Sequence, residues 1–202
     1  LPLVMKKKGH EEKAKYLESL FGKIYLGDII ERNKILHDKS VLDDLLNIIS
    51  SSVGSLTNAS KISKTFKSER QVSISDETVS RYLDFFIDAF MIYKAERYDV
   101  KGRKYIGSPL KYYFSDVGLR NARLNFRQQE ENHIMENIIY NELCNRDFSV
   151  DVGVVEYCYK DENKKSKRSQ LEIDFVANKG SKKYYIQSAL TVSEEEKRKQ
   201  EV

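Results

Sequence analysis

Hydrophobic residues recur with helical spacing over most of the first half of the chain. The strongest pattern lies in residues 75–93, where apolar positions follow one face of a helix: Val79, Tyr82, Leu83, Phe86, Ile87 and Phe90. Ser75 stands just before two acidic residues and is placed to cap this helix. Shorter stretches of the same pattern predict helices over residues 40–53 and 57–66, and a charged amphipathic helix over residues 10–36.

The pattern changes to that of strands after residue 91. Residues 91–114 carry β-branched and aromatic side chains on both sides of a polar turn at 99–104, which predicts a hairpin. Three helices followed by a hairpin is the order of a winged helix-turn-helix domain. The turn, as the tip of the wing, carries Lys101, Arg103 and Lys104, whose charges suit DNA phosphates. The alternative is a domain of this kind that makes only protein contacts.

The second half predicts a helix followed by strands. Residues 128–148 form the helix, on which Glu136 shares a partly apolar face, and residues 149–160 form a strand. Residues 161–170 predict a basic loop, and residues 171–189 a second hairpin. The loop supplies further candidate phosphate contacts: Lys164, Lys165, Lys167 and Arg168. The end of the chain predicts the start of a charged helix capped by Ser193.

Alternation within the second hairpin sets acidic residues apart from apolar ones. A strand places Glu172 and Asp174 on one face and directs the intervening apolar residues, which are Leu171, Ile173 and Phe175, toward the core. With a turn over residues 178–181, Glu172 is expected near Gln187 and Asp174 near Tyr185.

These side chains are a candidate metal site. Mg²⁺ takes oxygen ligands and usually one or two carboxylates, which Asp174, the Gln187 carbonyl and Glu136 of the preceding helix can supply. The alternative interpretation is that the acids are ordinary solvated residues of a strand and a helix.

Composition narrows the function classes. The 202 residues suffice for one large domain or two small ones, and a net charge of +4 means that any nucleic-acid signal must come from clustering. Two cysteines suit free thiols in a reducing cytoplasm, and no apolar run is long enough to span a membrane, so we expect a cytoplasmic protein. Gly22 and Lys23 lack the other residues of a phosphate-binding loop, so no ATP site is expected in this chain.

The order of several motifs resembles that of a known family. In chain order they are YLESLFGKIYLGDIIERNKI, ETVSRYLDFFIDAFMIYKAERYD, KYYFSDVGLRNA, MENIIYNEL, EIDFVA and YYIQSALTV. Together they are similar to the C-terminal region, a domain of unknown function, of prokaryotic AAA+-type ATPases. The resemblance implies an α+β fold: a winged helix followed by a degenerate α/β domain like the PD-(D/E)XK restriction endonucleases.

The resemblance also implies a division of the chain and a partner. Residues 1–36 would be a helical linker to an N-terminal domain that binds ATP, residues 37–115 the winged helix, and residues 116–202 the nuclease-like domain. By this resemblance, that ATPase domain would belong to the same protein and precede the region matched here.

The nuclease superfamily binds Mg²⁺ through an acid on a helix, an Asp on one strand and a (D/E/Q)xK motif on the next. Carried over to this sequence, the matching residues are Glu136, Asp174 and Gln187, but Ala189 stands where the motif has its lysine. Because that lysine activates water and stabilises developing charge, its loss predicts an inactive site. A lysine supplied from elsewhere in the chain is the alternative.

These observations predict a non-catalytic module that binds nucleic acid, with DNA as the expected partner, or protein. Two other functions stay open at this point. One is a metal-dependent nuclease of the PD-(D/E)XK type, and the other is a scaffold that binds only proteins.

Overall fold

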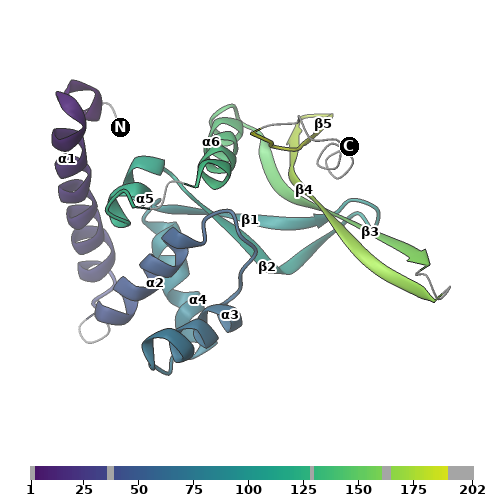
Figure 1. Ribbon diagram of the computed structural model, residues 1–202, viewed down its shortest axis with the longest axis horizontal. Coiled ribbons are helices and arrows are strands. Elements are labelled where there is room, and N and C mark those ends of the chain that lie inside the picture. The colour runs from purple at the N-terminus through teal and green to yellow at the C-terminus, as the bar shows by residue number, and fades with distance from the viewer. Residues whose placement is uncertain (1–2, 36–38, 128–129, 161–164, 191–202) are drawn as a thin grey trace. The chain divides into compact units, whose positions relative to one another are not determined.

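The computed structural model describes residues 3–35, 39–127, 130–160 and 165–190. They form a mixed α+β protein with six α-helices and one five-stranded mixed sheet (Figure 1). Lys164 and the expected Ser193-capped helix lie outside the described residues. In the described ranges, no helix is both long enough and apolar enough to cross a membrane.

The chain divides into two compact units, each built from two separate stretches. The first unit comprises residues 1–94 and 112–130, and the second comprises residues 95–111 and 131–202. The expected ranges 37–115 and 116–202 do not coincide with these units, because the outer part of the first hairpin belongs to the second unit.

The first unit is helical. Its elements are a 3-10 turn Val4–Lys6, α1 (Gly9–Ile24), a π-helical continuation Tyr25–Glu31, α2 (Lys39–Ser51), α3 (Ala59–Thr65), a π-helical turn Phe66–Arg70, α4 (Asp76–Asp88) and α5 (Val117–Arg123). Three of these helices, α2 to α4, precede the first hairpin in the expected order. The backbone N–H of Thr78 donates to the Ser75 hydroxyl, which confirms the expected cap of α4.

Helical structure continues past the end of the helix expected over residues 57–66. Residues 66–70 form a further helical turn, which the fully buried Phe66 anchors. The apolar stripe of α4 is confirmed as its buried side through Val79, Tyr82, Leu83 and Phe86. Of the other two positions of the stripe, Ile87 is half-buried, and Phe90 follows the helix at a positive φ of 53° and is 74% exposed.

The second unit is a sheet with one helix. The helix is α6 (Glu131–Asn145), and the strands are β1 (Ile92–Asp99), β2 (Lys104–Phe114), β3 (Ser149–Lys160), β4 (Ser166–Lys179) and β5 (Lys182–Ile186). Their order in the sheet is β2-β1-β3-β4-β5. Strand β1 runs parallel to β3, whereas β4 is antiparallel to both β3 and β5.

Polar residues make up much of the buried side of α6. Glu136, Asn137 and Tyr140 are buried, whereas Ile138 is 53% exposed. Tyr140 packs its ring 6.2 Å from that of Phe175 on β4. The expected apolar face of this helix is therefore wrong in part, because the helix covers a sheet face that itself carries charged side chains.

The second hairpin has a different register from the expected one. Only Gly180 and Ser181 lie between β4 and β5, and Gly180 takes a positive φ of 59° that glycine adopts readily. Phe175 is therefore opposite Ile186, and Val176 is opposite Tyr185.

The core side of β4 also differs from the expected alternation. A β-bulge opposite residues 151–153 of β3 interrupts the pairing beside Asp174. Phe175 and Val176 are both fully buried, whereas Leu171 is 50% exposed. The bulge explains why two successive residues are buried. Leu171 is exposed because β4 runs outward past the part of the sheet that α6 covers.

Candidate functional site

A lysine that the sequence analysis did not single out lies at the centre of the acidic residues. Lys111 of β2 places its Nζ 2.8 Å from Glu136 Oε1 on α6 and 2.7 Å from Glu172 Oε1 on β4. The side chain of Lys111 is only 4% exposed, and that of Glu136 is 11% exposed. The three residues form an ion cluster, buried at Lys111 and Glu136 and partly exposed at Glu172, that ties β2, α6 and β4 together.

The pKa of Lys111 reflects this environment. Burial lowers the pKa and is the largest single influence, but the two carboxylates attract the charged form and accept its hydrogen bonds. Together they outweigh the burial effect and raise the pKa of Lys111 above its ordinary value. Lys111 is therefore an ammonium group, and it fills the space between two carboxylates that a bound cation would otherwise neutralise.

The other two predicted ligands are held by a separate set of contacts. Asp174 Oδ2 accepts hydrogen bonds from the backbone N–H of Ser188 at 2.8 Å and from the Ser188 hydroxyl at 2.6 Å. Gln187 Oε1 accepts a weaker bond from the Asp174 backbone N–H at 3.3 Å. Gln187 thus lies beside Asp174 and not beside Glu172, which corrects the expected pairing by two residues.

These contacts do not fit a magnesium site. Mg²⁺ needs several oxygen atoms that converge on one point, whereas Glu136 and Glu172 converge on an ammonium and Asp174 on a serine. Within the described ranges, no group of three or more His, Cys, Asp and Glu side chains is placed to hold a metal ion. The metal site therefore stays a sequence-based prediction that the geometry does not support.

The predicted phosphate contacts gather at one end of the sheet. Because β1 and β3 are parallel, the turn after β1 lies beside the middle of β3: Asp99 is opposite Val154, and Val100 N donates to Val154 O at 2.9 Å. We call residues 99–104 the basic turn; its Lys101, Arg103 and Lys104 are exposed.

The basic turn is held in shape by its own aspartate. Asp99 Oδ1 accepts hydrogen bonds from the backbone N–H of Lys101 at 3.1 Å and of Gly102 at 2.8 Å. A side chain at Gly102 would collide with the Asp99 carboxylate, so any other residue at this position would have to displace that carboxylate. The turn therefore presents its cations from a fixed loop.

The second basic group lies on a strand and not in the expected loop. Strand β4 begins at Ser166, and residues 166–171 pair with residues 155–160 of β3. We call this pair of segments the outer ribbon. Among the described residues the two segments pair only with each other, so the ribbon extends beyond the other strands (Figure 1). From Ser166 on the expected loop is wrong, because a strand without a core face carries no apolar alternation, whereas residues 161–164 lie outside the described residues.

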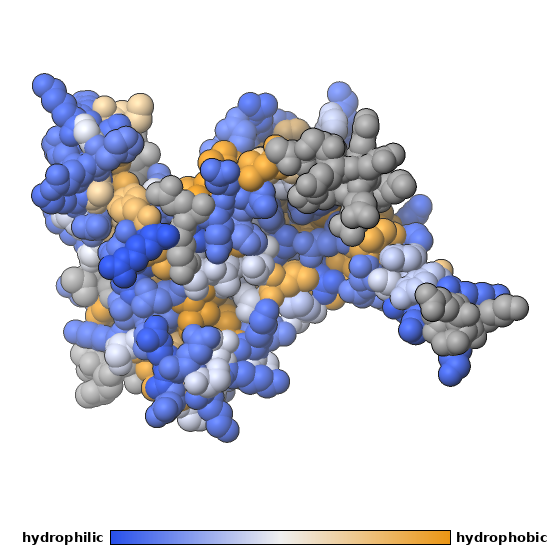
Figure 2. All heavy atoms as spheres, in the orientation of Figure 1, coloured by the Kyte–Doolittle hydropathy of each residue, from blue (hydrophilic) through white to orange (hydrophobic). Residues whose placement is uncertain are grey.

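The outer ribbon is basic and aromatic. It carries Lys160, Lys167 and Arg168, with Lys165 just before it, against one acid, Glu156. Tyr157 and Tyr159 are 36% and 45% exposed. Figure 2 shows hydrophilic residues around this end of the molecule.

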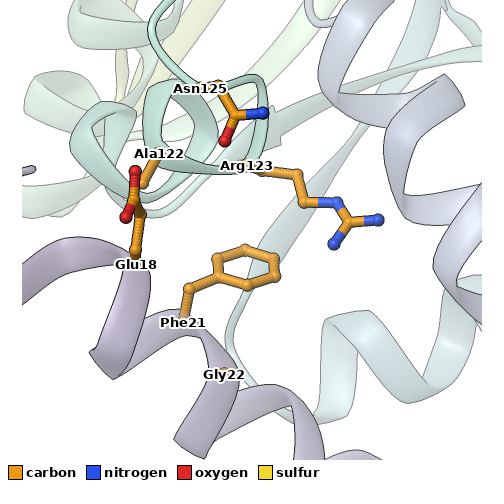
Figure 3. Close-up of a pocket in the computed structure, with 6 residues that line it drawn as sticks. All are labelled: Glu18, Phe21, Gly22, Ala122, Arg123 and Asn125. Carbon is orange, nitrogen blue, oxygen red and sulfur yellow. The ribbon is translucent and has the colours of Figure 1, made fainter. Parts of the chain in front are cut away.

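A pocket in the first unit offers no comparable site. It has a volume of about 320 Å³ and lies between α1 and α5 (Figure 3). Its Arg123 donates to Asn47 Oδ1 at 2.8 Å and to the Asp43 carboxylate, and its guanidinium lies 5.8 Å from the Phe21 ring. Arg123 is thus engaged in helix packing, and we assign no ligand to this pocket.

Comparison with known proteins places the chain in a family. Residues 1–130 match the model of a family described as "Domain of unknown function (DUF8612)". The chain belongs to this family. No solved structure matches the chain significantly.

Two curated relatives extend over most of the chain. An "Uncharacterized protein" of Haemophilus influenzae is 36% identical over 178 residues, which are 88% of this chain and 41% of the relative. "Uncharacterized protein MJ1544" of Methanocaldococcus jannaschii is 28% identical over 188 residues, which are 93% of this chain and 39% of the relative. The chain thus spans about two fifths of the length of these relatives.

Proposed function

We propose that the chain is a non-catalytic nucleic-acid-binding module of a longer prokaryotic protein. The observation that carries the proposal is that two basic segments, far apart in sequence, lie along the same strand, β3, of one sheet. The basic turn lies beside Val154, and the outer ribbon begins at the next residue of β3. Such a surface suits the phosphate backbone, which dominates the affinity of most nucleic-acid-binding proteins.

The size of this surface is adequate for several phosphate contacts. Six residues of strand extend the ribbon by about 20 Å at roughly 3.3 Å per residue. Each strand of duplex DNA carries one phosphate per about 3.4 Å of helix axis, so a ribbon of this length can reach several of them.

The proposal assigns the two halves of the chain to known architectures. The order α2, α3, α4 and then the β1–β2 hairpin suits a winged helix, whose wing tip is the basic turn. The order α6, β3, β4 and β5 suits a PD-(D/E)XK-like core with Glu136 on the helix and Asp174 on the middle strand. The missing lysine at Ala189 and the ammonium of Lys111 between two acids favour a core that has lost its chemistry.

We further propose that the parent protein is an AAA+-type ATPase. This part of the proposal rests on the motif resemblance, and about three fifths of each curated relative lies outside the matched region. The test is the coding sequence upstream of Leu1. A Walker phosphate-binding motif there is expected, and its absence would remove the ATPase from the proposal.

The binding proposal is tested by the salt dependence of affinity. Fluorescence anisotropy with labelled duplex and single-stranded DNA should show binding at about 50 mM salt that weakens steeply as salt rises. Arg103→Gln and Arg168→Gln should each weaken binding and reduce the salt slope by about one. Lys182→Gln is the matched control. Lys182 lies on β5 opposite Lys179, at the end of β4 that is far from the ribbon, so this variant should leave the affinity and the salt slope unchanged.

Two results would contradict the proposal. Absence of binding to either form of DNA at low salt would favour a scaffold that contacts only proteins. DNA cleavage that requires Mg²⁺ or Mn²⁺ and is abolished by Asp174→Ala would overturn the non-catalytic assignment and favour a nuclease.

A further inference from the structure

The two faces of the outer ribbon differ in chemistry. Opposite residues of an antiparallel pair project from the same face, so Tyr157 and Ser169 share a face with Tyr159 and Lys167. Glu156 and Gln170 project from the other face.

Polar contacts within the protein occupy the second of these faces. Gln170 Nε2 donates to Glu156 Oε1 at 2.8 Å, and Gln170 Oε1 accepts from Arg97 Nη2 at 3.2 Å. These bonds fix the inner part of that face as a network of side chains. The tyrosine face carries its aromatic rings toward solvent instead.

The two tyrosines form a pair of adjacent aromatic surfaces. The rings of Tyr157 and Tyr159 have centroids 5.9 Å apart and an interplanar angle of 32°. They follow each other at i and i+2 on β3, which keeps both on one face. No other described strand pairs with the outer ribbon. Its exposed rings are therefore not needed for the core.

A cation stands directly across the ribbon from the outer ring. Lys167 is opposite Tyr159 and shares its face, whereas Lys160 and Arg168 project from the other face of the ribbon. A flat aromatic surface beside a cation matches a ligand that combines flat bases with negative charges.

We propose that the tyrosine face of the outer ribbon binds single-stranded nucleic acid by stacking unpaired bases on Tyr157 and Tyr159. A phosphate of the same strand lies against Lys167, the cation that projects from this face. In a duplex the bases are stacked on one another and cannot cover these rings, so the face distinguishes single strands from duplexes. This inference rests on the proposed function and adds to it the form of nucleic acid that the ribbon recognises.

The test compares variants of the two tyrosines with a single strand of about twelve thymidines, a length within the usual site sizes of single-strand-binding proteins. Tyr157→Ala/Tyr159→Ala should weaken binding by about tenfold or more, because each base–aromatic stack contributes substantially to affinity. Tyr157→Phe/Tyr159→Phe should bind within about twofold of the wild type, since phenylalanine keeps the ring.

Two further measurements separate stacking from a general effect. Wild-type protein should prefer the thymidine strand to an abasic strand with the same phosphates, and the double alanine variant should lose this preference. Tyr185→Ala removes a tyrosine that is 54% exposed on β5 and should change neither measurement. Equal urea midpoints for the variants establish that the fold is intact.

The outcomes also separate this inference from the proposed function. Single-strand binding that survives in the double alanine variant, or that falls as far in the double phenylalanine variant, would overturn stacking and leave phosphate binding in place. A matching loss of duplex affinity in the double alanine variant would overturn the single-strand preference. Failure of the wild type to bind either form would remove both proposals.

Discussion

Lys111→Met is the most informative single substitution for the second unit. Methionine has a similar length and can occupy the same buried space, but it removes the ammonium that Glu136 and Glu172 share. Glu136 would then be a buried carboxylate without this partner. Glu172 would be affected less, because its side chain is 35% exposed and can be solvated.

The size of the effect follows from the geometry. At 2.8 Å and an effective dielectric constant of about 20, the gross attraction between Lys111 and Glu136 is roughly 6 kcal/mol. Desolvation of the two charges offsets part of this attraction. Breaking a buried pair by removing one partner costs about 3–5 kcal/mol. We expect a loss near 3 kcal/mol, since Glu136 keeps some exposure.

Urea unfolding at neutral pH, followed by circular dichroism, measures this loss. Lys111→Met/Glu136→Met is the decisive second variant: it removes both charges and should recover most of the stability. A Lys111→Met protein within about 0.5 kcal/mol of the wild type would refute the inference that the cluster is a buried ion network.

The pH dependence gives an independent check with a defined sign. The pKa of Lys111 is raised in the folded state, so its contribution is fully present below the unfolded pKa of about 10.4. That contribution is lost as pH rises through the higher folded pKa. The difference in stability between wild type and Lys111→Met should therefore be constant from neutral pH to about pH 9.5 and shrink above about pH 10.5. A difference that shrinks between pH 7 and 9 would contradict this assignment.

Three further predictions concern other contacts. Ser188→Ala should lower the free energy of unfolding by about 1.5–3 kcal/mol in urea, because it removes a 2.6 Å hydrogen bond to the Asp174 carboxylate; no change would show that this contact does not contribute. Gly102→Ala should destabilise the protein by about 1–3 kcal/mol through its collision with the carboxylate of the basic turn, whereas Gly107→Ala, which has open space, should stay within about 0.5 kcal/mol; equal thermal midpoints would count against the collision. Burial, with a smaller effect of a nearby carboxylate, raises the pKa of Tyr112 to about 12, so stability should fall by up to roughly 3 kcal/mol between pH 10 and 12. In denaturation curves, Tyr112→Phe should lose less unfolding free energy between pH 10 and 12 than the wild type. An equal loss in the two proteins would contradict the assignment.

Local patterns in the sequence were sufficient for much of the first unit. The helical spacing in residues 75–93 correctly predicted the buried side of α4, and Ser75 its cap. Asp116 stands just before α5 and caps it, with Leu119 N donating to its Oδ1 at 3.2 Å. These features depend on neighbours three or four residues apart, so a single sequence contains them.

The candidate sites depended on contacts that no local pattern contains. Lys111 lies in an apolar strand, where a lysine must find a partner, and this was the one available signal. Its actual partners are 25 and 61 positions away along the chain, Glu136 and Glu172. The bulge beside Asp174 and the two-residue turn at Gly180 then altered which side chains meet.

The sequence by itself determined which residues are charged, which helices form and that basic residues occur in two separate clusters. Tertiary structure alone decided that both clusters lie along β3. Parallel pairing of β1 with β3 places the basic turn beside Val154, and pairing of β3 with β4 converts an expected loop into a ribbon. Strand pairing joins segments through backbone hydrogen bonds that any side chain permits, so the composition of a segment does not reveal its neighbour.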